Sequence, residues 1–141
     1  MSAGDALAVA ATFVWLGMVL AISFLEAPLK FRAPGVTVPL GLGIGRLVFR
    51  ALNAAEALLA VVAGVGLAAG APPAAAVVAL AVAAAVLVAQ IVGVRPALTR
   101  RSDAVLAGGD APRSHAHLVY VVLEVVKVAA LVSGGVLLLA G

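Results

Sequence analysis

The chain has 141 residues, of which 65% are hydrophobic and 11% are charged, and its formal net charge is +3. Soluble domains are about 45–50% apolar and about 25% charged, so this composition excludes a water-soluble globule, a disordered chain and a coiled coil. The absence of cysteine excludes disulfides, thiolate metal ligands and cysteine catalysis. We therefore expect an all-α integral membrane protein with a single domain, residues 1–141.

Continuous apolar runs predict four membrane-spanning helices, because about 20 apolar residues cross a hydrocarbon core of roughly 30 Å and barrel strands would alternate instead. The expected spans cover about residues 6–27, 47–69, 74–94 and 118–139. Gly70-Ala71-Pro72-Pro73 separates the second span from the third, since proline cannot continue a helix but fits the first turn of the next. The N-terminus lacks the basic region of a cleavable signal peptide.

Basic residues gather in or beside two expected loops, about residues 28–46 and 95–117. They are Lys30, Arg32, Arg46, Arg50, Arg95, Arg100, Arg101 and Arg113. Positively charged loops stay cytoplasmic, so this pattern predicts both loops inside and both termini outside. The basic residues are too few, and too close to the membrane, for a nucleic-acid interface, and we expect the lipid bilayer itself as partner.

A shift of 68 residues superimposes three uncommon residues on equivalents in the second half. Pro28 falls on Pro96, Arg32 on Arg100 and Glu56 on Glu124. Each half would then be one helical hairpin, and the four-helix bundle would consist of two tandem hairpins related by a pseudo-two-fold axis along the membrane normal. Coincidence among a few residues is the alternative to this repeat.

Small residues predict close helix packing. Gly66 and Gly70 have GxxxG spacing at the end of the second span, and the third span is rich in alanine. Such surfaces let helix backbones approach one another in lipid. They could join helices within the bundle or between copies in a homo-oligomer, and both alternatives are open.

Two acids lie deep in the expected spans. Glu56 and Glu124 each follow the start of their span by nine or ten residues, which is roughly 14 Å at 1.5 Å per residue. An ionised carboxylate at that depth costs about 2.5–3.5 kcal/mol on insertion scales. We therefore expect both side chains to face the bundle interior, to be paired, or to be protonated.

Other polar residues share helix faces with these acids. On the fourth span, His117, Tyr120 and Lys127 have helical spacing with Glu124, and on the second span Phe49 and Asn53 have it with Glu56. One interpretation is a ligand- or proton-binding path formed by Glu56, Glu124, Asn53, His117, Tyr120 and Lys127. The other is internal satisfaction, with Glu124 paired to Lys127 and Glu56 hydrogen-bonded to Asn53.

Three further residues have simpler structural interpretations. Glu26 is expected to be an interfacial acid neutralised by neighbouring bases such as Lys30. Gln90 is expected to hydrogen-bond across helices, and Trp15 to pack in mid-span.

No cofactor or metal site is expected. His115 and His117 are two residues apart, which places them on different sides of a helix, and Asp110 adds no convincing third ligand. Asp110 and Ser114 are interpreted as helix-start caps. The alternating Gly41, Gly43 and Gly45 match no nucleotide-binding loop, and no serine nucleophile motif occurs, so enzyme activity is not favoured.

A resemblance covers most of the chain. It rests on the stretches Phe24 to Pro39, Gly41 to Glu56, Arg95-Pro96, His117 to Tyr120 and Leu123 to Lys127. In these the chain resembles a bacterial family of small uncharacterised four-helix membrane proteins, and more distantly it is similar to the transmembrane-protein-205-like family. The resemblance implies a multi-pass protein of the bacterial cytoplasmic (inner) membrane and implies no catalytic residues.

Three functions remain open at this point. The leading hypothesis is a small transporter- or channel-like protein that uses its membrane-embedded carboxylates, because those two acids occupy equivalent positions. The alternative is a non-catalytic accessory or assembly subunit of a membrane complex. A membrane-embedded enzyme acting on a lipid or quinone is a second alternative.

Overall fold

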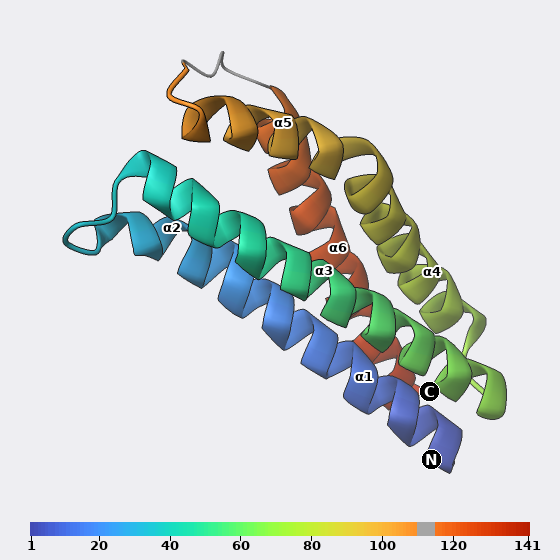
Figure 1. The fold of residues 1–141 in the computed structure, drawn as a ribbon. Helices are drawn as coiled ribbons and strands as arrows, with labels where there is room; N and C mark the ends of the chain where they lie inside the picture. The colour runs from blue at the N-terminus through green and yellow to red at the C-terminus, as the bar shows by residue number, and fades with distance from the viewer. Residues whose placement is uncertain (110–114) are drawn as a thin grey trace.

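The computed structural model describes residues 1–109 and 115–141, and in that part of the chain it contains helices and no strands. Within these described residues, four helical rods are long and apolar enough to cross a membrane, and they run Ala3–Arg32, Val38–Ala69, Ala74–Leu106 and His115–Ala140 (Figure 1). Each rod contains one predicted span, so the prediction of a four-helix, multi-pass membrane protein is confirmed in its helices and their order.

The first rod begins with a capped helix, α1 (Ala3–Val19). The backbone N–H of Asp5 donates to Ser2 Oγ at 3.1 Å, and the N–H of Ser2 donates back to Asp5 Oδ2 at 3.3 Å. This reciprocal pair satisfies two donors that a helix start leaves unpaired. Asp5 Oδ1 also accepts from the N–H of Ala71 at 3.1 Å, which joins the start of α1 to the turn that follows the second rod.

Two of the rods change helix type at a proline. The first continues through a π-helical segment, η1 (Leu20–Glu26), into α2 (Ala27–Leu29) and a 3₁₀ turn, η2 (Lys30–Arg32). The third consists of α4 (Ala74–Ala89), a second π-helical segment, η3 (Gln90–Val94), and α5 (Arg95–Leu106). Pro28 and Pro96 stand in the first turns of α2 and α5. Because proline has no N–H to donate, the wider π turn accommodates it.

The second rod is a single helix, α3 (Val38–Ala69), and it begins much earlier than predicted. Thr37 caps it by accepting from the N–H of Leu40 at 3.3 Å. The predicted loop 28–46 is therefore wrong over most of its length, and Gly41, Gly43 and Gly45 are helical. Gly41 packs so closely on the Phe31 ring that a Cβ would clash with it, and this contact explains why a glycine suits the helix there.

The fourth rod is α6 (His115–Ala140), and α5 occupies most of the second predicted loop, 95–117. The loop prediction is therefore also wrong here, because charged residues end a membrane span without ending a helix. Asp110 and Ser114, interpreted above as helix caps, lie outside the described residues.

The N-terminus, the C-terminus and the turn between α3 and α4 lie together at one end of the bundle, which we call the terminal end (Figure 1). There α1 packs on α3 with almost no side chain between the backbones. A Cβ on Gly66 would lie 2.6 Å from the backbone nitrogen of Ala8, and one on Gly4 would lie 2.6 Å from that of Gly70. The GxxxG spacing therefore joins two helices within the chain.

Further contacts toward this end pair α4 with α6 and α1 with α6. Gly134 of α6 receives Leu80 of α4, and Gly135 receives the ring of Phe13 of α1. The buried apolar core runs along these helices and consists of Ala8, Trp15, Leu16, Val19, Ala76, Leu80, Ala83, Leu87, Leu131 and Leu138.

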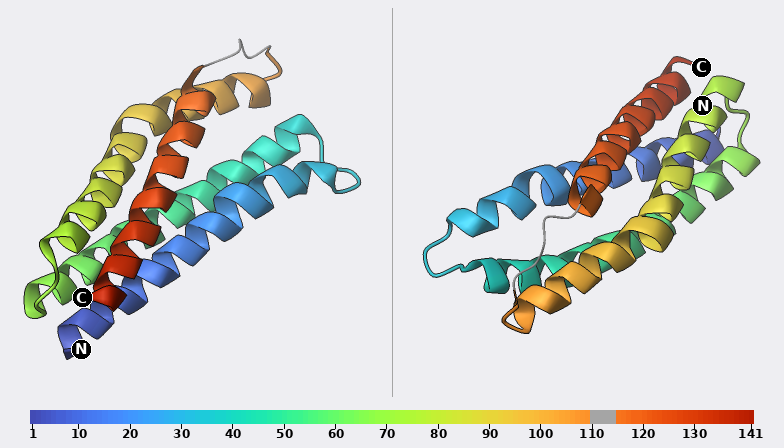
Figure 2. Two further views of the ribbon diagram at one scale, coloured as in Figure 1. Left: turned by 180° about the vertical axis from the view of Figure 1, so that it is seen from behind. Right: turned by 90° about the horizontal axis from the view of Figure 1, so that it is seen from above.

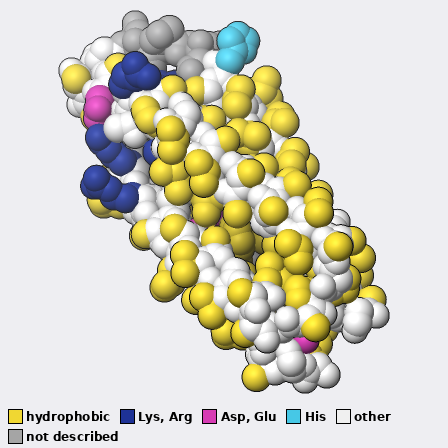
Figure 3. All heavy atoms as spheres, turned by 90° about the vertical axis from the view of Figure 1, so that its right-hand side faces the viewer, with side chains coloured by type: hydrophobic (Ala, Val, Ile, Leu, Met, Phe, Trp, Pro, Cys, Tyr) yellow, Lys and Arg dark blue, Asp and Glu magenta, His cyan; other side chains and the backbone are white. Residues whose placement is uncertain are grey.

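Toward the opposite end the rods diverge, and α2 and the start of α3 separate from the start of α6 (Figure 2). On the face shown in Figure 3, the lysine and arginine side chains gather at this end, and hydrophobic side chains cover most of the remaining length. We call the end opposite the terminal end the basic end. The bundle therefore has a tightly packed half toward the terminal end and an open half toward the basic end.

Candidate functional site

Three buried charges meet where α3 faces α6. The ammonium nitrogen of Lys127 lies 2.6 Å from Glu56 Oε1 and 2.5 Å from Glu124 Oε1, and all three side chains are 0–2% exposed. We call these residues the Glu–Lys–Glu triad. Removing such charges from water is costly, and direct pairing with hydrogen bonds is what makes their burial tolerable.

Gln90, the first residue of η3, completes the coordination of the lysine. Its Oε1 accepts from Lys127 Nζ at 2.7 Å, and its Nε2 donates to Glu124 Oε1 at 3.2 Å. An ammonium has three donors, and the two carboxylates and this amide engage all of them. The expected cross-helix hydrogen bond of Gln90 is thus confirmed.

The first rod contributes two donors to the carboxylates. The indole Nε1 of Trp15 donates to Glu56 Oε1 at 2.9 Å, and the hydroxyl of Ser23 donates to Glu124 Oε2 at 2.5 Å. Trp15 belongs to α1 and Ser23 to η1, so all four rods contribute to the network around the triad.

Asn53 connects the triad to a second cation. In the amide orientation that satisfies both neighbours, the Asn53 nitrogen donates to Glu56 Oε2 at 3.2 Å and its oxygen accepts from Arg95 Nε at 3.3 Å. Arg95 is the first residue of α5. The extended network therefore contains two carboxylates and two cations, and its formal charges balance.

Two aromatic rings hold the guanidinium of Arg95. Its Cζ lies 5.0 Å from the ring centroid of Phe49 and 4.9 Å from that of Tyr120, and the two rings meet edge to face at 5.7 Å. These are favourable cation–π distances. Arg95 Nη2 and the hydroxyl of Tyr120 are buried and have no hydrogen-bond partner among the described residues.

A cavity of about 960 Å³ opens beside the triad, between α2, α3, α5 and α6. Ser23, Asn53, Tyr120 and Glu124 line the part near the triad. Its apolar walls include Phe24, Phe31, Leu42, Leu47, Ile91 and Leu98, and its basic lining residues are Lys30, Arg46, Arg50, Arg95 and Arg101.

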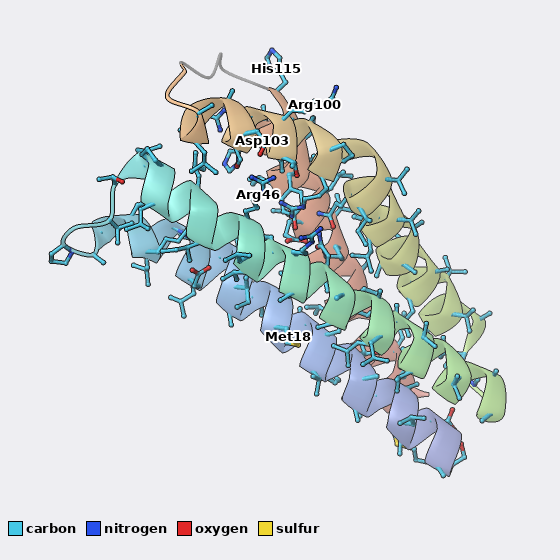
Figure 4. All side chains as sticks on the ribbon, viewed as in Figure 1. Met18, Arg46, Arg100, Asp103 and His115 are labelled. Atoms are coloured by element: carbon cyan, nitrogen blue, oxygen red, sulfur yellow. The ribbon has the colours of Figure 1, made fainter. Side chains whose placement is uncertain are left out.

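Two of the cavity's basic side chains are neutralised. Arg46 of α3 and Asp103 of α5 point toward one another across the gap and form an ion pair at 2.5 Å (Figure 4). Lys30 lies 3.8 Å from Glu26, as the sequence indicated for that acid. Within residues 1–109 and 115–141, Arg50 and Arg101 form no ion pair, so the cavity carries a surplus of positive charge.

The residues predicted as a site occupy two different positions. Glu56, Glu124, Lys127 and Asn53 form one network, and the pairings that the structural interpretation named are present within it. Tyr120 adjoins the network through Arg95. His117 lies apart from the triad, on the cavity wall.

Sequence reasoning missed three members of the network. Trp15 was expected only to pack, Arg95 was assigned to a loop or its edge, and Ser23 was considered only as a catalytic nucleophile, a role for which the sequence offers no motif. The η3 segment places Arg95 five residues after Gln90, and a π turn brings that spacing onto one face. In the sequence, a polar residue five positions before an arginine that directly precedes Pro96 was the signal that could have placed Arg95 beside Gln90 in the bundle.

A metal ion at the triad would have to displace Lys127, because the lysine engages both carboxylates. His115 points away from the bundle at the start of α6 (Figure 4). No group of three or more potential His, Asp or Glu ligands occurs among the residues that the structure describes.

Comparison of the chain with protein-family models, curated proteins and solved structures gives no match. The site is therefore interpreted from its own geometry.

Proposed function

We propose that this protein is a small membrane transporter in which Glu56 and Glu124 bind a proton or a polar ligand. One observation carries the proposal. Glu124 belongs to the buried triad, 2.5 Å from Lys127 Nζ, and it also lines the 960 Å³ cavity. A solute in the cavity can therefore reach a buried carboxylate without crossing a layer of apolar side chains.

The charge of the triad supports a role in proton coupling. Two carboxylates and one ammonium carry a formal charge of −1, which Arg95 balances through Asn53, so uptake of one proton by the triad gives the extended network a charge of +1. At an effective dielectric constant of about 20, two unit charges 4 Å apart interact by about 4 kcal/mol. A change in the charge of the cavity contents therefore affects the protonation of the triad, and this linkage is what a coupled transporter needs.

The asymmetry of the bundle supports alternating access. The cavity lies in the half toward the basic end, and the terminal end is closed by the glycine contacts between α1 and α3. Between the hairpins, α3 and α4 make little contact and α1 packs on α6, so rocking of one hairpin against the other about the α1–α6 contact is the motion that costs least packing. Movement of one packed unit against another is how many small transporters expose a central site.

We also propose that residues 3–69 and 74–140 are two copies of one hairpin. The 68-residue shift that aligns Glu56 with Glu124 also aligns the last residue of η1, Glu26, with the last residue of η3, Val94. Lys127 lies almost equally far from the two equivalent carboxylates, at 2.6 and 2.5 Å. A pseudo-two-fold axis along the membrane normal accounts for both observations.

The gathering of basic side chains at one end supports a cytoplasmic position for that end and an outside position for both termini. Together with the family resemblance, it leads us to propose the inner membrane of a bacterium as the location.

The transport proposal is tested in proteoliposomes that contain a pH-sensitive dye. A potassium gradient with valinomycin imposes a membrane potential, and the dye reports proton flux. We expect the wild-type protein to conduct protons above the rate of protein-free liposomes, and Glu124→Gln and Glu56→Gln to reduce the flux to that background.

Glu26→Gln is the matched control, because Glu26 is an acid at the basic end that pairs with Lys30 rather than with the triad. Its flux should equal that of the wild type. If the two triad variants conduct protons as fast as Glu26→Gln does, the carboxylates are structural and the proposal is overturned.

A further inference from the structure

We propose that the cavity binds an amphipathic anion, a molecule with one carboxylate or phosphate group on an apolar chain, and that Arg95 and Tyr120 hold the anionic group. The inference rests on the proposed function in taking this molecule as the transported substrate. Its binding is measured without any flux.

Two unpartnered donors define where the anionic group sits. Arg95 Nη2 and Tyr120 Oη are both buried without a hydrogen-bond partner among the described residues, and Tyr120 is 6% exposed. Both side chains line the cavity. Buried polar atoms are rarely left unpaired, because each costs about 1–3 kcal/mol. An acceptor with several lone pairs satisfies both donors together.

The guanidinium of Arg95 is held in one orientation, with its free Nη2 available to such an acceptor. The Nε of Arg95 is already used by Asn53, and the rings of Phe49 and Tyr120 fix the plane of the group. A fixed guanidinium fork recognises a carboxylate or phosphate better than a neutral carbonyl, because the hydrogen bonds are charge-assisted.

The remaining charges also favour an anion. Arg50 and Arg101 line the cavity outside any ion pair of the described residues, whereas the nearby Lys30 and Arg46 are neutralised. Glu124 on the same wall is held by Lys127, which offsets its repulsion of an anionic ligand. A cationic ligand would meet the unpaired arginines first.

The apolar and accessible walls of the cavity indicate that the ligand also has an apolar chain. Ala54 and Ala57 of α3 and Ile91 of η3 line the cavity and are exposed, so the cavity wall between α3 and η3 is accessible rather than covered by other side chains. An alkyl chain can leave by that route into the membrane. The volume of about 960 Å³ is at the upper end of small-molecule sites, about 300–1,000 Å³, which fits a single-chain amphiphile.

The test measures equilibrium binding of radiolabelled dodecanoate to the full chain in nanodiscs of zwitterionic phosphatidylcholine, with empty nanodiscs as the baseline. We expect saturable binding that unlabelled dodecyl phosphate displaces. Dodecanol, dodecyltrimethylammonium and the short anion butyrate should not displace it, because each lacks either the negative charge or the chain. Equal displacement by dodecanol or dodecyltrimethylammonium would overturn the inference.

Variants locate the site. Tyr120→Phe keeps the ring and deletes only the hydroxyl, and it should weaken dodecanoate binding at least about threefold, whereas Arg95→Gln should weaken it at least about tenfold. Arg32→Gln is the control, because Arg32 is an exposed cation at the same end that does not line the cavity. Wild-type affinity in both Tyr120→Phe and Arg95→Gln would contradict the assignment.

The source of the anion is distinguished by adding phosphatidylglycerol to the nanodiscs. Displacement of dodecanoate identifies a bilayer lipid as the anion, and undiminished binding identifies an amphiphile from solution. Saturable binding by a protein without proton flux would remove the transport proposal and leave this site. Triad-dependent proton flux without dodecanoate binding would remove this inference alone.

Discussion

Trp15 and Glu56 are 41 positions apart in the chain and are joined by a hydrogen bond of 2.9 Å between the indole nitrogen and a carboxylate oxygen. Trp15 is 1% exposed and is the single tryptophan of the protein. Because Trp15 contacts Glu56 directly and does not line the cavity, its emission reports on the triad, and no introduced label is needed.

The first prediction uses this fluorescence. In nanodiscs, the emission maximum of the wild-type protein should shift over the pH range in which the triad gains or loses a proton, because the charge beside the indole changes. Glu56→Gln should abolish most of that shift, since the amide does not ionise. Glu26→Gln, which alters a distant acid, should retain it. Superimposable pH profiles for Glu56→Gln and the wild type would show that Glu56 does not titrate.

The second prediction concerns the stability of the triad. Lys127→Met leaves two buried carboxylates without their cation and should lower the free energy of unfolding by about 3–5 kcal/mol. Glu124→Gln leaves one carboxylate paired with one ammonium and should cost less, about 1–3 kcal/mol. Unfolding in detergent micelles, followed by circular dichroism during denaturant titration, measures both values.

A double variant separates charge from packing in this experiment. Lys127→Met combined with Glu56→Gln should be more stable than the sum of the single losses predicts, by about 0.5–3 kcal/mol, because residues of one network couple. Strict additivity would mean that the lysine and Glu56 do not interact energetically.

The third prediction concerns the terminal end. Gly66→Ala places a methyl group 2.6 Å from the backbone nitrogen of Ala8, and it should destabilise the protein by about 1–3 kcal/mol through overpacking. Gly64→Ala is the matched control two residues earlier in α3, where a Cβ meets nothing within 4 Å. It should be neutral or slightly stabilising, since alanine favours a helix. Equal thermal stability of the two variants in micelles would show that α1 and α3 can separate freely there.

The fourth prediction contrasts an exposed ion pair with the buried triad. Arg46 and Asp103 are 39% and 56% exposed, so Asp103→Asn should change the free energy of unfolding by less than about 1 kcal/mol. A loss as large as that of Lys127→Met, measured in the same denaturant titration, would assign a major structural role to the basic end.

The spans and the inward position of the acids could be predicted because both follow from the requirement that only apolar side chains face the hydrocarbon core. A run of about 20 apolar residues identifies a crossing, and an acid within it must avoid lipid. The structure agrees at Glu56 and Glu124, which are almost fully buried. The ion pair between Glu124 and Lys127 could also be predicted from the sequence, because the two residues are three positions apart in one helix.

The ends of the helices could not be predicted by the same reasoning. Hydropathy measures suitability for lipid, and it does not detect a helix that continues beyond the apolar run, as α3 does at Gly41 and α5 does at Arg100. The inward position of Arg95 depends on the π turn before it, and the bond between Trp15 and Glu56 depends on the packing of α1 against α3. Neither is encoded in local spacing alone.

The division of the triad between two hairpins has a consequence for biogenesis. The first hairpin supplies Glu56 with hydrogen bonds from Trp15 and Asn53, whereas its ammonium partner comes from the last helix, 71 positions later in the chain. At roughly 5–20 residues per second, the ribosome needs about 4–14 s to make that stretch. During this interval Glu56 enters the translocon without its counter-ion, so the nascent first hairpin must insert with a neutral acid or wait at the insertion machinery for α6.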